Sequence, residues 1–315
     1  MTDILFEDYF QEFINIMQQK QEDKDSIDFN YFEDCFNKFI DLFSKEQIDF
    51  VRENINEWHK AYLEADEYNL NHIEGIWGNG FALYKCYIES STRFCDEYLK
   101  YIEKNKKFET NSDGKSVFTA LRYINGRAIH IANEILILLK NGYADGAYAR
   151  FRTLFESSVI ADFIVKHGDE AATKYMEYKK ERYGWASDIL NIKNPNFYDI
   201  AENSNIKKEY FDLWKKEFKL CHKLVHASPQ ATFTRIALNK LMDNILIGPC
   251  DDGLSLPAVN SIEALYHIHC LYFGWDNEFM PLLWINVLKK IKEETQNEFD
   301  YIQANSFATE EDKND

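Results

Sequence analysis

Two groups of ionisable residues interrupt otherwise apolar helical sequence. The first group is Arg152 and Glu156, which are four residues apart. The second group follows later in the chain and comprises Lys219, His222 and His226. Charged side chains are costly to hold against an apolar core unless they are paired. Both groups are therefore candidates for a polar site at which chemistry or binding takes place.

The first group lies on a helix predicted over residues 144–166. At 100° per residue, Arg152 and Glu156 fall on one stripe of that helix. The second half of the helix is apolar nearly all round, which predicts a central and buried position. One interpretation is a structural ion pair that fixes the helix register. The other is a guanidinium that binds phosphate or carboxylate while Glu156 orients it. Arg150 lies about 160° away around the helix and is predicted to serve another face.

The second group lies on a helix predicted over residues 206–227. His226 is close to the end of this helix, where a protonated histidine is favoured by the helix dipole, so a simple helix-end cation is one interpretation. Acid–base chemistry is the functional interpretation, because histidine changes its charge near neutral pH. In that case Lys219 attracts an anionic ligand, and His222 assists.

A metal site is the weaker interpretation of the two histidines. His222 and His226 have the i,i+4 spacing of zinc ligands, but Lys223 stands where zinc peptidases place a glutamate. His267 and His269 do not add ligands, because residues two apart point to opposite sides of a helix. No metal and no other cofactor is therefore expected.

Helical periodicity dominates the whole chain, and no apolar–polar alternation is long enough to build a sheet. The predicted fold class is all-α, a multi-helix bundle whose buried central helix carries Arg152 and Glu156. Helices are predicted over residues 1–20, 31–43, 45–66, 71–104, 116–140, 144–166, 169–192, 206–227 and 258–295.

Boundary signals separate these helices. Ser44 is a plausible N-cap for the helix over 45–66. Asn141-Gly142 is typical of a helix C-terminus, and His167-Gly168 is predicted to end the next helix. Three regions follow: an acidic helical N-terminal region over 1–110, a helical core domain over 111–295, and a polar tail over 296–315. The last residues of this tail, from Ser306, are expected to be disordered.

The charge distribution limits the classes of partner. The net charge of -17 argues against broad nucleic-acid binding, which needs a basic face. Residues 174–224 nevertheless hold 11 basic against 8 acidic residues, so a local basic surface could bind RNA. Residues 1–110 hold 24 acidic against 12 basic residues, which suits a protein partner better than a nucleic acid.

Several features point to the cytoplasm. The start of the chain lacks the basic and apolar stretches of a signal peptide. The longest strongly apolar run, residues 135–139, is too short to span a membrane. Six cysteines are scattered without CxxC spacing, which suggests free and mostly buried thiols. Cys221 is a poor nucleophile for the neighbouring His222, because adjacent helical residues point apart.

Two stretches, residues 120–166 and 208–230, resemble a bacterial helical family known as domain of unknown function 5677. The resemblance is carried by Arg127, the helix over 134–139, the turn over 141–147, Arg150 to Glu156, and residues 224–228. It implies a helical fold with a polar site, but no reaction.

The chain is also similar in outline to the HEPN superfamily, helical bundles whose active members are metal-independent ribonucleases in toxin and antiviral systems. Those enzymes place an arginine a few residues before a histidine near a helix end. Here Lys219 is the nearest basic residue on the His226 face, so Arg152 would have to supply the guanidinium from another helix. The resemblance implies an intracellular bacterial effector of stress or phage defence that forms homo-oligomers.

The resemblance also implies a set of catalytic roles. His226 would act as acid or base for attack by the 2′-hydroxyl of RNA. Arg152, oriented by Glu156, would stabilise the charge on the phosphorane, with Lys219 or His222 assisting. The alternative is a non-catalytic helical binding or assembly module, in which Arg152, Glu156 and His226 form a buried structural network. In that case the acidic N-terminal helices bind a partner chain.

Overall fold

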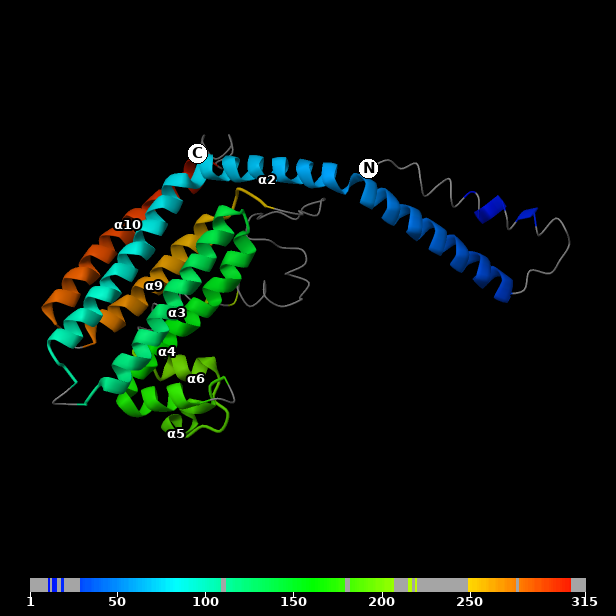
Figure 1. Cartoon of the computed structure of the whole chain (residues 1–315). Coiled ribbons are helices and arrows are strands. Elements are labelled where there is room, and N and C mark those ends of the chain that lie inside the picture. Colours follow the sequence, from blue (N-terminus) through cyan, green and yellow to red (C-terminus); the bar gives the residue numbers. More distant parts are fainter. Residues whose placement is uncertain are drawn as a thin grey trace, which may run out of the picture. The chain divides into compact units, whose positions relative to one another are not determined.

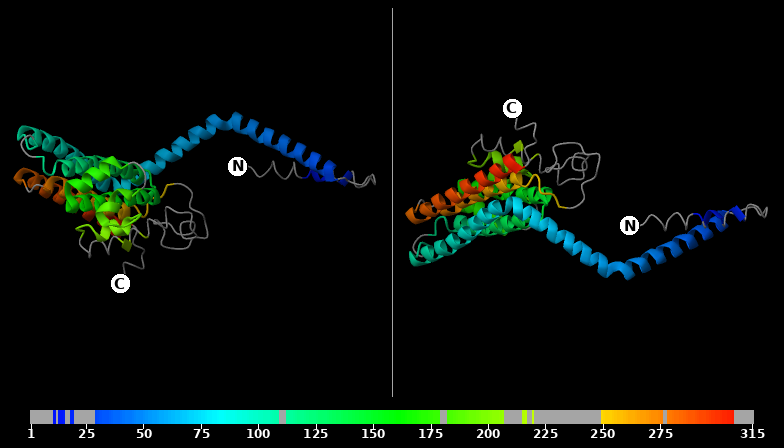
Figure 2. Two further views of the ribbon diagram at one scale, coloured as in Figure 1. Left: turned by 90° about the horizontal axis from the view of Figure 1, so that it is seen from below. Right: turned by 90° about the horizontal axis from the view of Figure 1, so that it is seen from above.

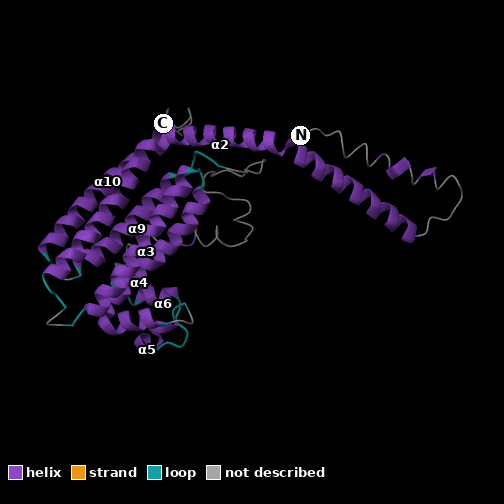
Figure 3. Cartoon of the chain, viewed as in Figure 1, coloured by secondary structure: helices purple, strands orange, loops and turns teal. Residues whose placement is uncertain are grey.

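The computed structural model describes residues 29–108, 112–178, 182–206, 249–275 and 278–306, together with residues 11, 13–15, 18, 19, 215, 216 and 219. The described residues form helices and loops and contain no strand (Figure 3). The predicted all-α class is confirmed. None of the described helices combines the length and apolarity that crossing a lipid bilayer requires.

The chain divides into two compact units, residues 1–68 and residues 69–315. Helix α2, Phe29–Lys104, contributes residues to both units (Figure 1). The division therefore falls inside the region over 1–110 that the sequence suggested as one unit. Residues 69–104 belong with the core because their apolar side chains are buried, including Trp77 and Tyr98, which have no exposed surface.

The prediction of three separate helices, over 31–43, 45–66 and 71–104, is wrong. Helix α2 is continuous through Ser44 and through residues 67–70. Ser44 has the chemistry of an N-cap, but no glycine or proline accompanies it and the helical pattern continues on both sides. A serine inside a helix costs only a few tenths of a kcal/mol, about 0.5, which the neighbouring helix formers offset.

The second unit is a bundle of long helices (Figures 1 and 2). Helices α3, Lys115–Lys140, and α4, Ala144–Glu177, form an antiparallel pair, and both contact α9, Ser255–Gly274. Helix α10, Phe279–Ser306, packs along α9. The second half of α2 joins them through aromatic contacts, such as Trp77 with Phe299 of α10 and Tyr98 with Tyr272 of α9.

The turn between α3 and α4 is built on Gly142, which has a φ of 72°. A Cβ atom at this position would approach the backbone of Cys250 to 2.8 Å, so only glycine fits. Tyr143 N–H donates to the carbonyl of Leu138 at 2.9 Å and closes the helix end. The predicted end of a helix at Asn141-Gly142 is confirmed.

Helix α4 changes direction where the sequence predicts an end. Gly168 has φ 74° and ψ −158°, outside helical geometry, but the chain becomes helical again and continues to Glu177. The carboxylate of Asp169, directly after this kink, accepts hydrogen bonds from the N–H groups of Gly114 and Val117 at 2.7 and 2.9 Å. The kink thus places a carboxylate where it caps the start of α3.

Three further predictions are corrected. The helix over 169–192 is replaced by the end of α4, a 3-10 turn η1 (Gly184–Ala186) and the short helix α5 (Ser187–Leu190). The helix over 258–295 is interrupted between Gly274 and Phe279, which separates α9 from α10. Residues 296–306 continue α10 instead of starting a tail, because Phe299 and Ile302 are buried.

Other predictions lie on residues that are only partly described. Most of the helix predicted over 206–227 and the tail beyond Ser306 lie outside the described residues. Five of the six cysteines are described and free. Cys86 is exposed and the other four are partly buried, so the expectation of mostly buried thiols fails for Cys86 among these five.

Candidate functional site

Helix α4 brings Arg152 and Glu156 together one turn apart. Arg152 Nε donates a hydrogen bond to Glu156 Oε1 at 3.2 Å. The two side chains are only 15% and 8% exposed, so the pair is largely removed from water. Their i,i+4 spacing and their position on a buried helix were both predicted from the sequence.

A second guanidinium, from Arg182, completes this group. Arg182 Nη2 donates to Glu156 Oε2, so the two oxygens of one carboxylate hold two different arginines. The Arg182 side chain is 61% exposed and its guanidinium lies over the Tyr183 ring, 5.4 Å from the centroid. The group therefore reaches from the interior of the bundle to its surface.

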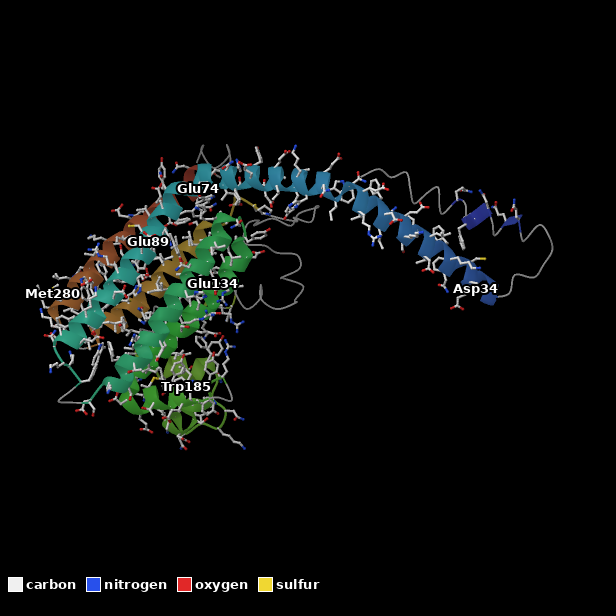
Figure 4. The ribbon with its side chains drawn as sticks, viewed as in Figure 1. Asp34, Glu74, Glu89, Glu134, Trp185 and Met280 are labelled. Carbon is white, nitrogen blue, oxygen red and sulfur yellow. The ribbon has the colours of Figure 1, made fainter. Side chains whose placement is uncertain are left out.

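The chain reverses after α4, and an aromatic anchor holds the returning segment. Trp185 of η1 packs edge-on against Phe163 and Tyr175, with ring centroids 5.4 and 5.2 Å apart (Trp185 is labelled in Figure 4). Trp185 is buried. Because η1 is fixed on α4 in this way, Arg182 just before it is brought back to the level of Glu156.

Helix α6, Phe197–Glu202, supports the same group from the other side. Phe197 packs edge-on against Phe155 of α4 at 5.6 Å and lies 6.4 Å from the Tyr183 ring. A capping box at Asn196 and Asp199 fixes the start of this short helix. These ring contacts hold the segment that carries Arg182 and Tyr183 against α4 through α6.

Charge and burial together determine what the Arg152–Glu156–Arg182 group can bind and keep Tyr183 protonated. Counted over Arg152, Arg182 and Glu156 alone, two guanidinium groups share one carboxylate. Burial raises the pKa of the Tyr183 phenol to about 12, and the negative charge of Glu156 adds to this effect. Tyr183 is therefore a neutral phenol at physiological pH, and no described residue hydrogen-bonds to its oxygen. The group can bind an anion, and Tyr183 supplies a hydroxyl next to it.

The remaining predicted site residues are placed less completely. Lys219 is helical and exposed, and His222 and His226 lie outside the described residues. Lys215, on the same predicted helix, has its Nζ 5.5 Å from the centroid of the Tyr198 ring of α6. The structure thus brings Arg152 and Glu156 together, while the approach of the histidines to them is untested.

Glu134 on α3, labelled in Figure 4, is a second carboxylate with several basic partners. Arg150 of α4 donates to Glu134 Oε2, and His130 Nε2 and Arg127 Nη1 lie 3.0 and 3.7 Å from Glu134 Oε1. Arg150 therefore serves a different face from Arg152, as the helix geometry predicts. Glu134 is 32% exposed, so water reaches this cluster.

The histidines of α9 point in two directions, as their spacing predicts. His267 faces α4, with Nε2 3.7 Å from Asp162 Oδ1, and Asp162 also accepts from the N–H of Asn205. His269 faces α2, where Tyr87 Oη lies 2.8 Å from its Nδ1. Among the described residues, no group of three or more histidine, cysteine and acidic side chains is arranged to hold a metal ion.

Residues 118–227 match the model of a family of unknown function, DUF5677. The resemblance predicted from the sequence is confirmed over this range. The DUF5677 segment contains most of α3, all of α4, the segment with Arg182, and α6, so it includes both carboxylate clusters. No curated protein and no solved structure matches the chain.

Within the DUF5677 segment, sequence reasoning missed Arg182. It lies 26 residues from Glu156, within a run of basic residues that is typical of a solvated helix face. The available signal was indirect: the excess of basic residues over 174–224 indicated an anion-binding surface without naming the residue.

Proposed function

We propose that the protein is a cytoplasmic bacterial effector of stress or phage defence that binds RNA and cleaves it without a metal ion. The observation that carries the proposal is the sharing of one buried carboxylate, Glu156, by two guanidinium groups. Arg182 is 61% exposed, so one of these two guanidinium groups is open to solvent and to an anionic ligand. The bacterial defence setting rests on the HEPN-like outline of the sequence.

The roles follow from the chemistry of each group. Arg152 and Arg182 bind the scissile phosphate and stabilise the negative charge that grows on it during 2′-hydroxyl attack. Glu156 positions both guanidinium groups and takes no proton. His226 acts as acid or base, and Lys219 or His222 assists with phosphate binding. Tyr183 stays neutral and offers a hydrogen bond to a phosphate oxygen.

Induced expression in a bacterial host tests this proposal. We expect growth arrest and fragmented RNA with the unaltered chain, and both effects lost with His226→Ala and with Arg182→Ala. His130→Ala is the matched control, because His130 is a histidine that is 63% exposed and sits at the Glu134 cluster. Purified proteins are then incubated with RNA in the presence of EDTA. Cleavage that survives His226→Ala, or that EDTA abolishes, would contradict the mechanism.

A non-catalytic binding or assembly module is the second candidate, because Arg152 and Glu156 are largely buried and form an ion pair. In this case the ion pair has a structural role, and the acidic N-terminal helix binds a partner chain. Intact RNA with the purified unaltered protein, combined with a large loss of stability on removing Glu156, would favour the module over the ribonuclease.

A further inference from the structure

The first half of α2 carries an apolar stripe that is open to solvent. The stripe consists of Ile48, Val51, Ile55, Trp58 and Tyr62, which are 51%, 40%, 53%, 38% and 63% exposed. These positions alternate in steps of three and four residues, so they share one narrow face of the helix. All of them belong to the first unit, residues 1–68.

This spacing is that of the a and d positions of a heptad repeat, the seam by which two helices form a coiled coil. Ile48, Ile55 and Tyr62 take the a positions, and Val51 and Trp58 take the d positions. Phe13, from the described N-terminal residues, packs outside this stripe, with its ring centroid 5.9 Å from that of Phe36 and 5.4 Å from that of Phe39.

We propose that this seam binds the same seam of a second copy of the chain, with the two helices antiparallel. An antiparallel pair places each a position opposite a d position of the partner. Ile55 then faces Trp58, and Val51 faces Tyr62. Each of these layers combines a small with a large side chain, which fills space evenly. A parallel pair would place two Trp58 rings in one layer and two Tyr62 rings in another.

The charges beside the seam agree with this orientation. Lys45 and Asp66 both occupy e positions, which flank the seam near its two ends. The antiparallel arrangement brings Lys45 of each copy toward Asp66 of the other, giving two attractive pairs. The remaining e positions, Arg52 and His59, face each other and add no attraction. In a parallel pair the e positions face g positions, which here hold Gln47, Asn54 and Ala61, so no ion pair forms.

The same helix is poorly suited to other large partners. Residues 29–68 contain ten acidic and four basic side chains. This balance repels nucleic acids and anionic lipid surfaces, whose recognition requires clustered basic residues. An identical helix avoids this problem, because the acidic residues lie mainly on the outer face and the seam itself is uncharged.

The mass of the full chain in solution tests the proposal. Light scattering after size-exclusion chromatography should give twice the chain mass of 37.3 kDa. Ile55→Asp places a charge in the seam and should return the mass to that of one chain. Asn56→Asp is the matched control, since it adds the same charge at the next residue on the outer face and should remain a dimer. Val51→Asn provides a second, milder seam variant.

Circular dichroism checks that each variant keeps its helices. A single-chain mass for the unaltered protein would overturn the proposal, and so would a dimer that Ile55→Asp leaves intact. The first result would also mean that the seam is covered within one chain, and the second that dimers form through another surface.

The orientation is tested by reversing charges. Lys45→Asp and Asp66→Lys should each raise the dimer dissociation constant by about 2- to 10-fold, since exposed ion pairs contribute little and two are lost per dimer. The double variant restores opposite charges at both ends and should bind more tightly than either single variant. A double variant that is no tighter than the single ones would contradict the antiparallel arrangement.

Discussion

The carboxylates of Glu156 and Glu134 bind similar sets of basic side chains but differ in their exposure to water. Each carboxylate lies within the α3–α4 pair and receives two arginines: Arg152 and Arg182 at Glu156, Arg127 and Arg150 at Glu134. Glu134 also receives His130. The Glu156 side chain is 8% exposed, whereas that of Glu134 is 32% exposed. The two clusters therefore differ mainly in how far water can replace a lost partner.

This difference in exposure determines how much each cluster contributes to the stability of the fold. At Glu134 water solvates any group that loses its partner, so the ion pairs add little to stability. At Glu156 and Arg152, which are 8% and 15% exposed, removing one member of the pair leaves the other charge largely removed from water, and such a charge is strongly destabilising. A buried, rigid pair is also better able to hold a third group, Arg182, in a fixed position at the surface.

The largest expected effect is a contrast in stability between two matched variants. Glu156→Gln keeps the shape of the side chain but removes the buried negative charge beside Arg152, and should lower the free energy of unfolding by about 3 kcal/mol. Glu134→Gln should lower it by less than about 1 kcal/mol. Urea unfolding of both proteins at one pH measures the difference. Equal losses would show that burial does not distinguish the two clusters.

A smaller effect is expected when both partners are replaced. Glu156→Leu alone should be destabilising, because Arg152 keeps its buried charge. Adding Arg152→Met removes that charge while keeping the volume, and should regain about 2 kcal/mol, since apolar replacement of a buried pair is often neutral or better. Arg182 needs no compensation because it can turn to water. Together with Arg152→Met alone, these variants and the unaltered chain form a double-mutant cycle, and additive losses would rule out a coupled buried pair.

The sequence predicts the features that depend on local spacing. The pairing of Arg152 with Glu156, the different face of Arg150 and the turn at Gly142 all follow from helix geometry or from the conformation that one residue requires. Arg182 could not be found in this way, because its contact with Glu156 depends on the chain reversing after α4 and on Trp185 anchoring the return.

Two helix boundaries are also mispredicted from the sequence, because they depend on contacts that local sequence does not reveal. Ser44 has the chemistry of a cap, yet α2 continues through it, because a cap signal has little weight where the helical pattern extends on both sides. Phe299 and Ile302 give the end of α10 a buried face, although its surrounding residues read as a polar tail. In each case the decisive contacts are with residues distant in the sequence.

A third and smaller effect is expected from replacing the exposed arginine at each carboxylate. Arg182 and Arg127 are 61% and 53% exposed, one at each carboxylate. Arg182→Ala and Arg127→Ala should each change the free energy of unfolding by less than about 1 kcal/mol. RNA binding should distinguish them: only Arg182→Ala should weaken it, as measured by filter binding at constant salt. Equal weakening by both variants would place RNA contacts on both faces and remove the special role of Glu156.

The smallest expected effect is a pH dependence that only the Glu156 cluster should show. Tyr183 has a pKa raised to about 12 by burial and by the charge of Glu156, against an ordinary value near 10. The folded state keeps the phenolic proton where the unfolded chain releases it. This contribution to stability is therefore complete below about pH 10 and is lost as the pH rises through about 12.

Tyr183→Phe removes this titration. The two proteins should unfold at similar urea concentrations at pH 8, since no described residue hydrogen-bonds to the phenol. Between pH 9 and 11 the variant should lose less stability than the unaltered chain. Other buried tyrosines, such as Tyr84 and Tyr272, titrate equally in both proteins and cancel in the comparison. A constant difference across this range would mean that the Tyr183 phenol is not held neutral beside Glu156, so that water reaches this cluster as it reaches Glu134.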